Sequence, residues 1–325
     1  MRAAVYTERG PAAQVLSVVE VARPEPGPGE VLVRVRWSGV NPTDWKARAG
    51  SGAVSFPYQV PGQDGAGDVE AVGPGVDAAR VGERVWVYHA ADLRQHGTSA
   101  QYTVVPAEQA VRLPDTVTYE QGAGLGIPYV TAHFCVLGDG PVDGRTLLVT
   151  GGAGAVGSAA IQLARWAGAE RVLATVSTPA KGELATASGA DVVLGYRGDG
   201  FLAALAAAAA PDGVHRVVDV ALGANLDADL SVLRTGGTIV TYASEDADPV
   251  VPTRRLMTEN VTLRFVLVYT LAPSQLAHAV RDITSALEDG ALHELPRHVF
   301  GLDDVAAAHD AVQAGAVGKV LLRVD

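Results

Sequence analysis

The sequence predicts an α/β fold that combines a doubly wound parallel sheet with a second, β-rich unit, and two regions of the chain carry this prediction. Before about residue 110, short runs of β-forming residues are broken by Gly and Pro, as in antiparallel strands joined by turns. After about residue 123, apolar runs alternate with segments of helical composition. Apolar strands spaced by helices indicate a parallel sheet that helices cover on both faces.

The β-rich unit is predicted from alternating polarity. Residues 31–40, VLVRVRWSGV, alternate as a half-buried strand does, and the Pro- and Gly-rich residues 24–29 provide the turn before them. Residues 65–73, 83–88 and 100–105 continue this pattern. We expect these runs to form a compact and mostly antiparallel unit.

The parallel sheet is predicted to hold six strands, at residues 146–150, 171–176, 191–194, 216–220, 238–242 and 262–268. The Ala-rich residues 201–210 lie between two of these runs. Pro211 and Gly213 follow them, so we expect an ordinary helix rather than a low-complexity segment. Six strands separated by helices match a dinucleotide-binding fold.

The chain returns to a β pattern after about residue 290. Residues 296–300 and 319–324 are predicted strands, and residues 303–315 are a predicted helix between them. We expect this C-terminal segment to join the β-rich unit at the start of the chain.

Composition limits the classes of partner and location. Of the residues, 48% are hydrophobic and 19% charged, and the net charge of −11 argues against nucleic acid or a membrane surface as a partner. The first ten residues lack the apolar core of a secretory signal, and no apolar run is long enough to span a membrane. Cys135 is the only cysteine, which argues against a disulfide or a Cys-based zinc site, and we expect it to be buried. A soluble, cytoplasmic protein is the expectation.

The strongest local motif is a glycine turn between a predicted strand and a predicted helix, Gly152-x-Gly154-x-x-Gly157. In such a turn the first glycine permits the bend, the second lets the backbone approach a phosphate, and the third lets the helix pack close to the strand. The pyrophosphate of a dinucleotide would meet the amides at the helix N-terminus. A purely structural turn is the alternative, because glycine-rich turns are common.

The choice of nucleotide is predicted from the loop after the second strand. A NAD site usually places an acidic residue there to hold the ribose 2′-hydroxyl, but residues 174–178 read ATVST. Lys181 follows, and Tyr196 and Arg197 follow the third strand, whereas Glu183 falls inside the next predicted helix. Hydroxyls and cations suit a 2′-phosphate, so we expect NADP(H) rather than NAD.

The whole chain resembles the zinc-independent quinone oxidoreductases, the zeta-crystallin-like branch of the medium-chain dehydrogenase/reductase superfamily. The matching stretches are residues 38–50, 61–76, 81–86, 150–157 and 318–322. This resemblance implies a GroES-like catalytic domain made from residues 1–122 and 290–325, and a Rossmann domain at residues 123–289. It also implies a cofactor between the two domains and a homodimer formed through the last Rossmann strand, residues 262–268.

Zinc-dependent relatives carry Cys where this chain has Asn41, and Gly-His-Glu where it has Gly62-Gln63-Asp64. An amide cannot replace a thiolate in the usual tetrahedral zinc site, so no metal is expected there. The eight histidines show no metal-binding spacing, and we expect them at surface or core positions. Without a Lewis acid, the chemistry favoured is hydride transfer to a conjugated acceptor such as a quinone or an α,β-unsaturated carbonyl.

The resemblance also implies the site residues. Asn41 and Asp44 would line the nicotinamide end, Thr131 would contact the carboxamide, and Lys181 and Tyr196 would bind the 2′-phosphate. The complete set predicted to bind NADPH is Asn41, Thr131, Gly152, Ala153, Gly154, Ala155, Val156, Gly157, Ser177, Lys181, Tyr196, Leu222 and Lys319.

The predicted catalytic residues are Asn41, Asp44 and Lys46. Asn41 and Lys46 would donate hydrogen bonds to the developing oxyanion or enolate, and Asp44 would orient Lys46 or its loop. Three tyrosines are alternative proton donors, although we expect each to pack in the core with its hydroxyl satisfied, and solvent is another source: Tyr58, Tyr129 and Tyr269.

Two alternatives to quinone reduction stay open. The pattern Asn-Pro-x-Asp-x-Lys at residues 41–46 is similar to that of the enone and alkenal reductases of the same branch, which reduce a carbon–carbon double bond. A non-catalytic, crystallin-like NADPH-binding protein is the alternative from another functional class.

Overall fold

The computed structural model describes residues 1–244 and 248–324, and the chain forms two compact units. The β-rich unit comprises Met1–Ile127 and Pro296–Asp325, and the parallel-sheet unit comprises Pro128–Leu295. The units change over a few residues later than the domain limits predicted from the sequence, 122/123 and 289/290. Residues 123–127 stay with the β-rich unit because the buried carboxylate of Asp64 accepts a hydrogen bond from the amide of Ile127.

The β-rich unit is built on a mostly antiparallel sheet with the strand order β14-β15-β3-β4-β5-β7, with β6 paired to β3. Its strands are β1 (Arg2–Val5), β2 (Ser17–Glu20), β3 (Glu30–Val40), β4 (Asp64–Val72), β5 (Arg84–Val87), β6 (Tyr102–Pro106), β7 (Ala110–Arg112), β14 (Arg297–Gly301) and β15 (Lys319–Arg323). Its helices are α1 (Ala12–Val15), α2 (Pro42–Ala49), α3 (Tyr119–Gly122) and α11 (Val305–Gln313). Strands β1 and β2 form a separate ribbon.

Both ends of the chain build this unit, as predicted. The C-terminal strand β15 runs antiparallel to β3, with Val320 opposite Val40 and Arg323 opposite Trp37. The apolar residues of β3 alternate inward, so Val31 and Val33 are fully buried in a valine-rich core. The pairing brings the first residue of β15, Lys319, to the end of β3.

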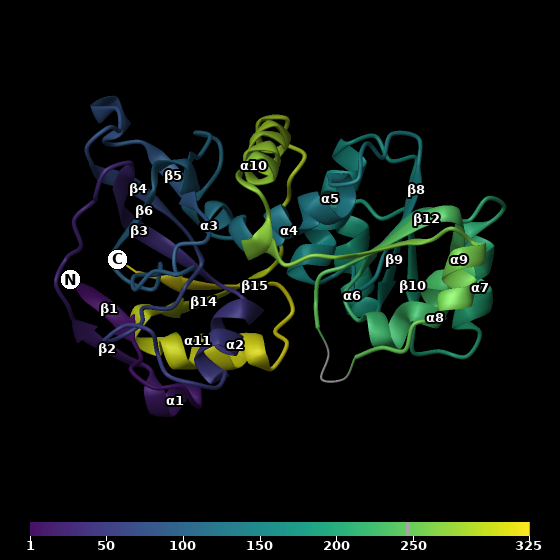
Figure 1. Ribbon diagram of the computed structural model, residues 1–325, viewed down its shortest axis with the longest axis horizontal. Helices are drawn as coiled ribbons and strands as arrows, with labels where there is room; N and C mark the ends of the chain where they lie inside the picture. The colour runs from purple at the N-terminus through teal and green to yellow at the C-terminus, as the bar shows by residue number, and fades with distance from the viewer. Residues whose placement is uncertain (245–247, 325) are drawn as a thin grey trace. The chain divides into compact units, whose positions relative to one another are not determined.

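The parallel-sheet unit has six strands in the order β10-β9-β8-β11-β12-β13, and every neighbouring pair is parallel. The strands are β8 (Thr146–Val149), β9 (Arg171–Val176), β10 (Val192–Gly195), β11 (Val214–Asp219), β12 (Leu233–Thr241) and β13 (Thr262–Phe265). The helices are α4 (Gly126–Leu137, which begins in the other unit), α5 (Ala155–Trp166), α6 (Pro179–Ala187), α7 (Phe201–Ala209), α8 (Leu222–Val232), α9 (Thr253–Thr258) and α10 (Pro273–Glu288). Helices cover the sheet (Figure 1), which confirms the predicted doubly wound fold.

The strand order fixes where a ligand can lie in this unit. From β8 the chain adds β9 and β10 on one side, then returns to add β11, β12 and β13 on the other side. The order therefore reverses between β8 and β11. Open α/β sheets bind ligands outside the carboxyl ends of the strands at such a reversal.

Strand limits differ most from the sequence prediction in β12 and β13. Strand β12 begins at Leu233, five residues before the predicted start at residue 238, and an irregularity in its register with β11 accommodates Gly236-Gly237. Strand β13 ends at Phe265 instead of residue 268, since Val268–Thr270 form a 3-10 turn.

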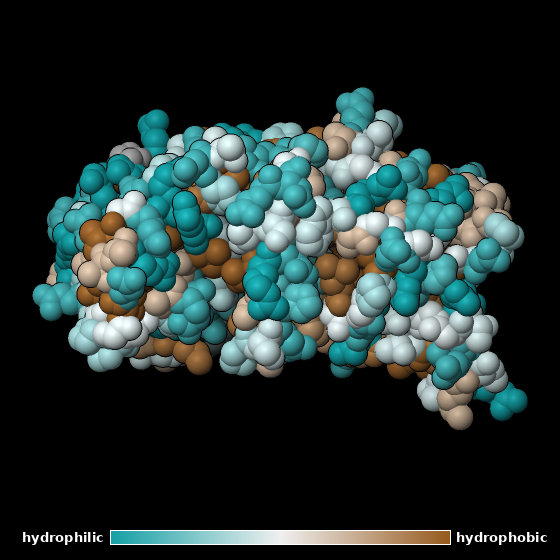
Figure 2. Space-filling view, turned by 90° about the horizontal axis from the view of Figure 1, so that it is seen from above, coloured by the Kyte–Doolittle hydropathy of each residue, from teal (hydrophilic) through white to brown (hydrophobic). Residues whose placement is uncertain are grey.

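The surface is mixed in character. Hydrophobic residues are scattered among hydrophilic ones on the face that Figure 2 shows. Of the helices in the described part of the chain, none has the length and apolar character needed to cross a membrane.

Candidate active site

The glycine turn of the parallel-sheet unit joins β8 to α5, and its first glycine has a different role from the one expected. The residue with positive φ is Gly151 (+65°), not Gly152, so Gly151 makes the bend. A Cβ on Gly152 would lie 2.8 Å from that of Ala174, and a Cβ on Gly157 would lie 2.3 Å from the carbonyl oxygen of Gly151. Gly152 and Gly157 therefore permit close packing of helix, turn and sheet.

The start of α5 offers unpaired backbone donors. Its N-cap is Gly154, which is exposed and has no side chain to accept from the first amides. The amides of the first helical turn have no partner within the helix, and the helix dipole makes them favourable to an anion. Ala155 and Val156 are half-buried, so this turn is open to a ligand. The arrangement can hold a pyrophosphate, as predicted for this motif.

A buried polar network holds the carboxyl ends of the strands beside the turn. The carboxylate of Asp219, at the end of β11, accepts hydrogen bonds from Thr150 Oγ1 (3.0 Å), Thr241 Oγ1 (3.1 Å) and Asn225 Nδ2 (2.8 Å). Thr150 follows β8 and Thr241 ends β12, so the network spans the point where the strand order reverses. Sequence reasoning did not select Asp219, although a carboxylate that ends an apolar strand was the available signal.

A pocket of about 420 Å³ lies at the carboxyl ends of β9 and β10. Ser177, Thr178 and Arg197 are among the residues that line it, and no carboxylate is among the described lining residues. Thr178 caps α6, since its hydroxyl accepts from the amide of Lys181 (3.3 Å). Tyr196 is 46% exposed, and the Arg197 guanidinium lies 5.9 Å from the centroid of its ring. The cation that lines this pocket is Arg197, one of the residues on which the NADP(H) prediction rested. Lys181 and Tyr196, which the resemblance assigned to the 2′-phosphate, are not among the described lining residues.

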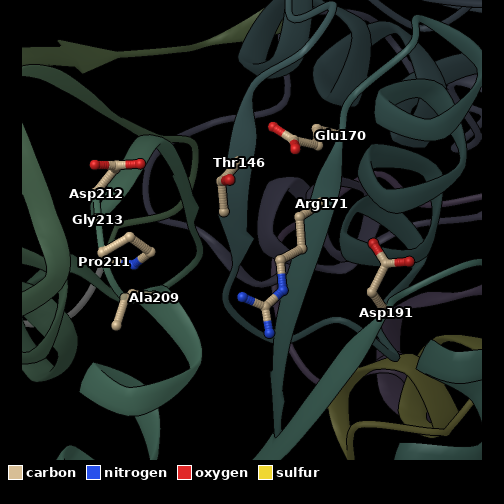
Figure 3. Close-up of a pocket in the computed structure, with 9 residues that line it drawn as sticks. Thr146, Glu170, Arg171, Asp191, Ala209, Pro211, Asp212 and Gly213 are labelled. Atoms are coloured by element: carbon tan, nitrogen blue, oxygen red, sulfur yellow. The ribbon is translucent and has the colours of Figure 1, made fainter.

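A second pocket, of about 430 Å³, lies at the opposite edge of the same sheet (Figure 3). Thr146 and Arg171, which begin β8 and β9, line it together with the carboxylates of Glu170, Asp191 and Asp212. An amino-terminal edge with three carboxylates is unsuited to a dinucleotide phosphate. The carboxyl edge therefore suits a dinucleotide better than this edge does.

In the β-rich unit, three neighbouring strands bring Asn41, Asp64 and Lys319 together. The Lys319 ammonium donates to Asn41 Oδ1 (2.6 Å) and lies 3.9 Å from Asp64 Oδ2, and Asn41 Nδ2 donates to the same Asp64 oxygen (2.7 Å). All three residues are buried. A Cβ on Gly39 would lie 2.0 Å from the carbonyl oxygen of Ala123 and 3.1 Å from Lys319 Cε, so the close approach of the Ala123 backbone requires a glycine beside the lysine.

The charges of this cluster are poorly solvated. Burial raises the pKa of Asp64 to about 6, although the ammonium of Lys319 and the hydrogen bonds from Ile127 and Asn41 oppose the rise. Burial lowers the pKa of Lys319, against the attraction of Asp64 and Asp44. The cluster is a lysine ammonium held in a nearly dry site by one carboxylate and one amide. The sequence analysis did not select Asp64 as a site residue. The available signal was that Gly62-Gln63-Asp64 stands where zinc-dependent relatives carry Gly-His-Glu.

Asp44 fixes the backbone around Asn41. Its carboxylate accepts from the amides of Asn41 (2.7 Å) and Gln63 (3.1 Å), closing the N-terminal turn of α2. Burial raises the pKa of Asp44 to about 7, and these hydrogen bonds counteract the rise. Lys46 is exposed on α2, with its ammonium 5.9 Å from the ring centroid of Trp45. The catalytic roles assigned to Asn41, Asp44 and Lys46 stay predictions.

The remaining predicted residues lie as follows. Thr131 is buried in α4, and Leu222 packs in the core under β8 and β11. The Tyr58 hydroxyl pairs with His96 Nε2 (3.1 Å), and the Tyr129 hydroxyl donates to Gln162 Oε1 (3.4 Å), so both have the partners expected of packed tyrosines. Cys135 is fully buried, as predicted, and burial raises its pKa.

We predict that Lys319→Met destabilises the fold more at high pH than at low pH. The pKa of Asp64 in the folded protein lies above the usual value of 3.8, so the stability that this carboxyl contributes falls as the pH rises through about 6. Lys319 limits this loss of stability by pairing with the Asp64 carboxylate. Removing it should lower the unfolding free energy by on the order of 3 kcal/mol at about pH 8, and by less at about pH 5.

Urea unfolding at both pH values measures the effect, with Lys46→Met as the exposed control. An equal loss at the two pH values would contradict the assigned role of Lys319.

Comparison with protein families gives two matches. A model described as alcohol dehydrogenase GroES-like domain matches residues 27–115, within the β-rich unit. A model described as zinc-binding dehydrogenase matches residues 155–285, from the start of α5 into α10. The two matches follow the division of the chain into its two units.

Relatives match over almost the whole chain. The quinone oxidoreductase of Sus scrofa is 30% identical over 93% of this chain and 92% of its own. The structure of a mycobacterial quinone oxidoreductase has a TM-score of 0.86 and 33% identity over 99% of both chains. A mycobacterial structure complexed with NADPH has a TM-score of 0.86 and 32% identity, covering 99% of this chain and 100% of its own.

The GroES-like unit, the Rossmann unit with its glycine turn and the full-length relatives agree. The chain is an oxidoreductase that belongs to the quinone oxidoreductase branch of the medium-chain dehydrogenase/reductase superfamily.

Proposed function

We propose that this oxidoreductase transfers a hydride from NADPH to a quinone and does so without zinc. The observation that carries the proposal is the carboxyl edge of the parallel sheet, where an open helix N-terminus follows the glycine turn and the pocket after β9 contains Arg197 but no acidic residue among those described. The names of the relatives support the quinone, and the mycobacterial structure with NADPH supports the nucleotide.

The chain contains residues that fit NADPH. The amides of Ala155, Val156 and Gly157 would hold the pyrophosphate, because glycines leave the turn free of side chains. Ser177 and Arg197, with Lys181 and Tyr196 near them, would hold the 2′-phosphate. Thr131 would contact the carboxamide of the nicotinamide, as the family resemblance implies. When bound, NADPH supplies the hydride, and the residues described here bind it and select it over NADH.

The donors of the Asn41 cluster do not fit a catalytic zinc ion. They are one amide oxygen and one carboxylate, whereas catalytic zinc sites combine three protein ligands that include imidazole or thiolate groups. The Lys319 ammonium already lies within hydrogen-bonding distance of the amide oxygen and faces the carboxylate. A divalent ion here would be repelled by a buried cation at short range. We therefore derive no step through zinc.

Lys319 supplies the positive charge of this site. The Asn41 amide uses its oxygen to accept from Lys319 and its nitrogen to donate to Asp64, so its polar atoms are already engaged. The ammonium has three donors and gives one to Asn41. We propose that another stabilises the oxygen that becomes negative as the acceptor is reduced. The quinone then takes up one hydride and one proton, and solvent or Lys319 provides the proton.

NADPH oxidation by the purified protein tests the proposed activity. We expect faster turnover with 1,4-benzoquinone than with methyl vinyl ketone. The decrease in NADPH absorbance measures the turnover. Faster turnover with the ketone would favour enone reduction. Tight NADPH binding with no turnover of either acceptor would overturn the catalytic proposal and favour a crystallin-like role.

We predict that Arg197→Ala raises KM for NADPH roughly tenfold and leaves KM for NADH nearly unchanged, because a charge-assisted hydrogen bond contributes about 1.5–3 kcal/mol. Lys181→Ala should also raise KM for NADPH, but by a smaller factor, since Lys181 is not among the described residues that line the pocket. Steady-state kinetics with both nucleotides measure the effect. Arg171→Ala, at the opposite edge of the sheet, is the control. Equal increases for both nucleotides would contradict a 2′-phosphate site.

We also propose a homodimer formed through β13, which ends the parallel sheet and exposes a polar backbone edge. Phe265 and Leu267 beside this edge are 68% and 58% exposed, which suits burial against a second copy. A cytoplasmic location stays a prediction from the sequence.

The double variant Phe265→Asp/Leu267→Asp should be monomeric in sedimentation velocity, because the interface would have to bury two carboxylates per chain. Met257→Asp, on α9 and 76% exposed, should leave the dimer intact. A wild-type protein that sediments as a monomer would refute the proposed dimer.

A further inference from the structure

Two histidines and an aspartate converge on helices α4 and α10 of the parallel-sheet unit. His278 and Asp282 are four residues apart on α10, a spacing that puts them on one face of the helix. His133 on α4 meets them there. Asp282 Oδ2 lies 2.7 Å from His133 Nε2 and 3.1 Å from His278 Nε2. One carboxylate oxygen is thus shared by two imidazoles.

The three ligand atoms are close enough to bind one ion. All lie within 4.8 Å of one another, and the two imidazole rings have centroids 5.4 Å apart. In a tetrahedral zinc site with bonds of about 2.0–2.1 Å, neighbouring ligand atoms are roughly 3.4 Å apart. Small rotations of side chains would convert the observed arrangement into such a site.

The burial of the three residues suits a site that solvent can reach. The His133 side chain is only 5% exposed, that of Asp282 is 24% exposed and that of His278 is 60% exposed. His133 and Asp282 are thus held in place, while His278 lies at the open side.

We propose that His133, His278 and Asp282 form a Zn²⁺ site that links α4 to α10. Two imidazole nitrogens and one carboxylate oxygen are ligands typical of zinc, and the fourth position faces solvent and would hold water. The linear spacing of the histidines does not reveal this group, because His133 and His278 come from helices far apart in the chain. We assign the ion a crosslinking role, because its ligands come from two different helices of the parallel-sheet unit.

Metal-free protein without an affinity tag tests the proposal, by calorimetric titration with Zn²⁺ and by the visible absorption of Co²⁺ as a tetrahedral probe. We expect one equivalent to bind per chain and to raise the melting temperature. His278→Ala should weaken binding by roughly a hundredfold and abolish the rise in melting temperature. This variant is chosen because the side chain is exposed, so the fold should tolerate it. His298→Ala, an exposed histidine of the β-rich unit, is the matched control and should bind as the wild type does.

Asp282→Asn provides a second test, because it keeps the shape of the side chain and removes the charge that attracts the ion. It should also weaken Zn²⁺ binding, while NADPH oxidation by both variants stays at the wild-type level. Binding that is absent, or equal in the His278 and His298 variants, would overturn the site. Neither result depends on the proposed quinone reduction, which is measured separately.

Discussion

The buried contact between Lys319 and Asp64 is the constraint on which the catalytic half of the protein depends. Placing an ammonium and a carboxylate away from water is costly unless each finds further partners. Here the carboxylate accepts from the Ile127 amide and from Asn41, and the ammonium donates to Asn41. Since Lys319 begins the last strand and Asp64 begins β4, the same contact fastens the C-terminal segment to the first part of the chain.

That contact also supports the proposal that the site works without zinc. Lysine brings one positive charge into a buried position, and in the proposed mechanism its ammonium stabilises the oxygen that becomes negative. A conjugated acceptor spreads its incoming charge, so it needs less stabilisation than an alkoxide does. The hydrogen bonds from Asp44 to the amides of Asn41 and Gln63 keep the surrounding loops in place. The electrostatics of the cluster therefore suit a soft acceptor.

Much of the fold could be predicted because its signals are local. The run at 171–176 forms β9 as predicted, and the alternation in residues 31–40 gives β3 with its valines inward. The glycine turn was also predictable, but the individual roles were not, because only the backbone geometry shows that Gly151 bends the chain while Gly152 and Gly157 meet neighbouring atoms. Asp64 and Asp219 escaped prediction for a related reason. Each matters through partners from other strands, and a single sequence does not show which strands become neighbours.

The histidine–aspartate group on α4 and α10 changes how a zinc measurement on this protein should be interpreted. The matching family model is described as zinc-binding dehydrogenase, so zinc found in the purified protein would readily be assigned to catalysis. In this chain the residues at the expected catalytic position are an amide, a carboxylate and a lysine, whereas the imidazole-containing group lies in the parallel-sheet unit. A zinc ion held there would support the packing of α10 against α4 without polarising an acceptor. Stoichiometric zinc and zinc-independent hydride transfer are therefore compatible in one molecule, and only the position of the ion distinguishes a structural role from a catalytic one.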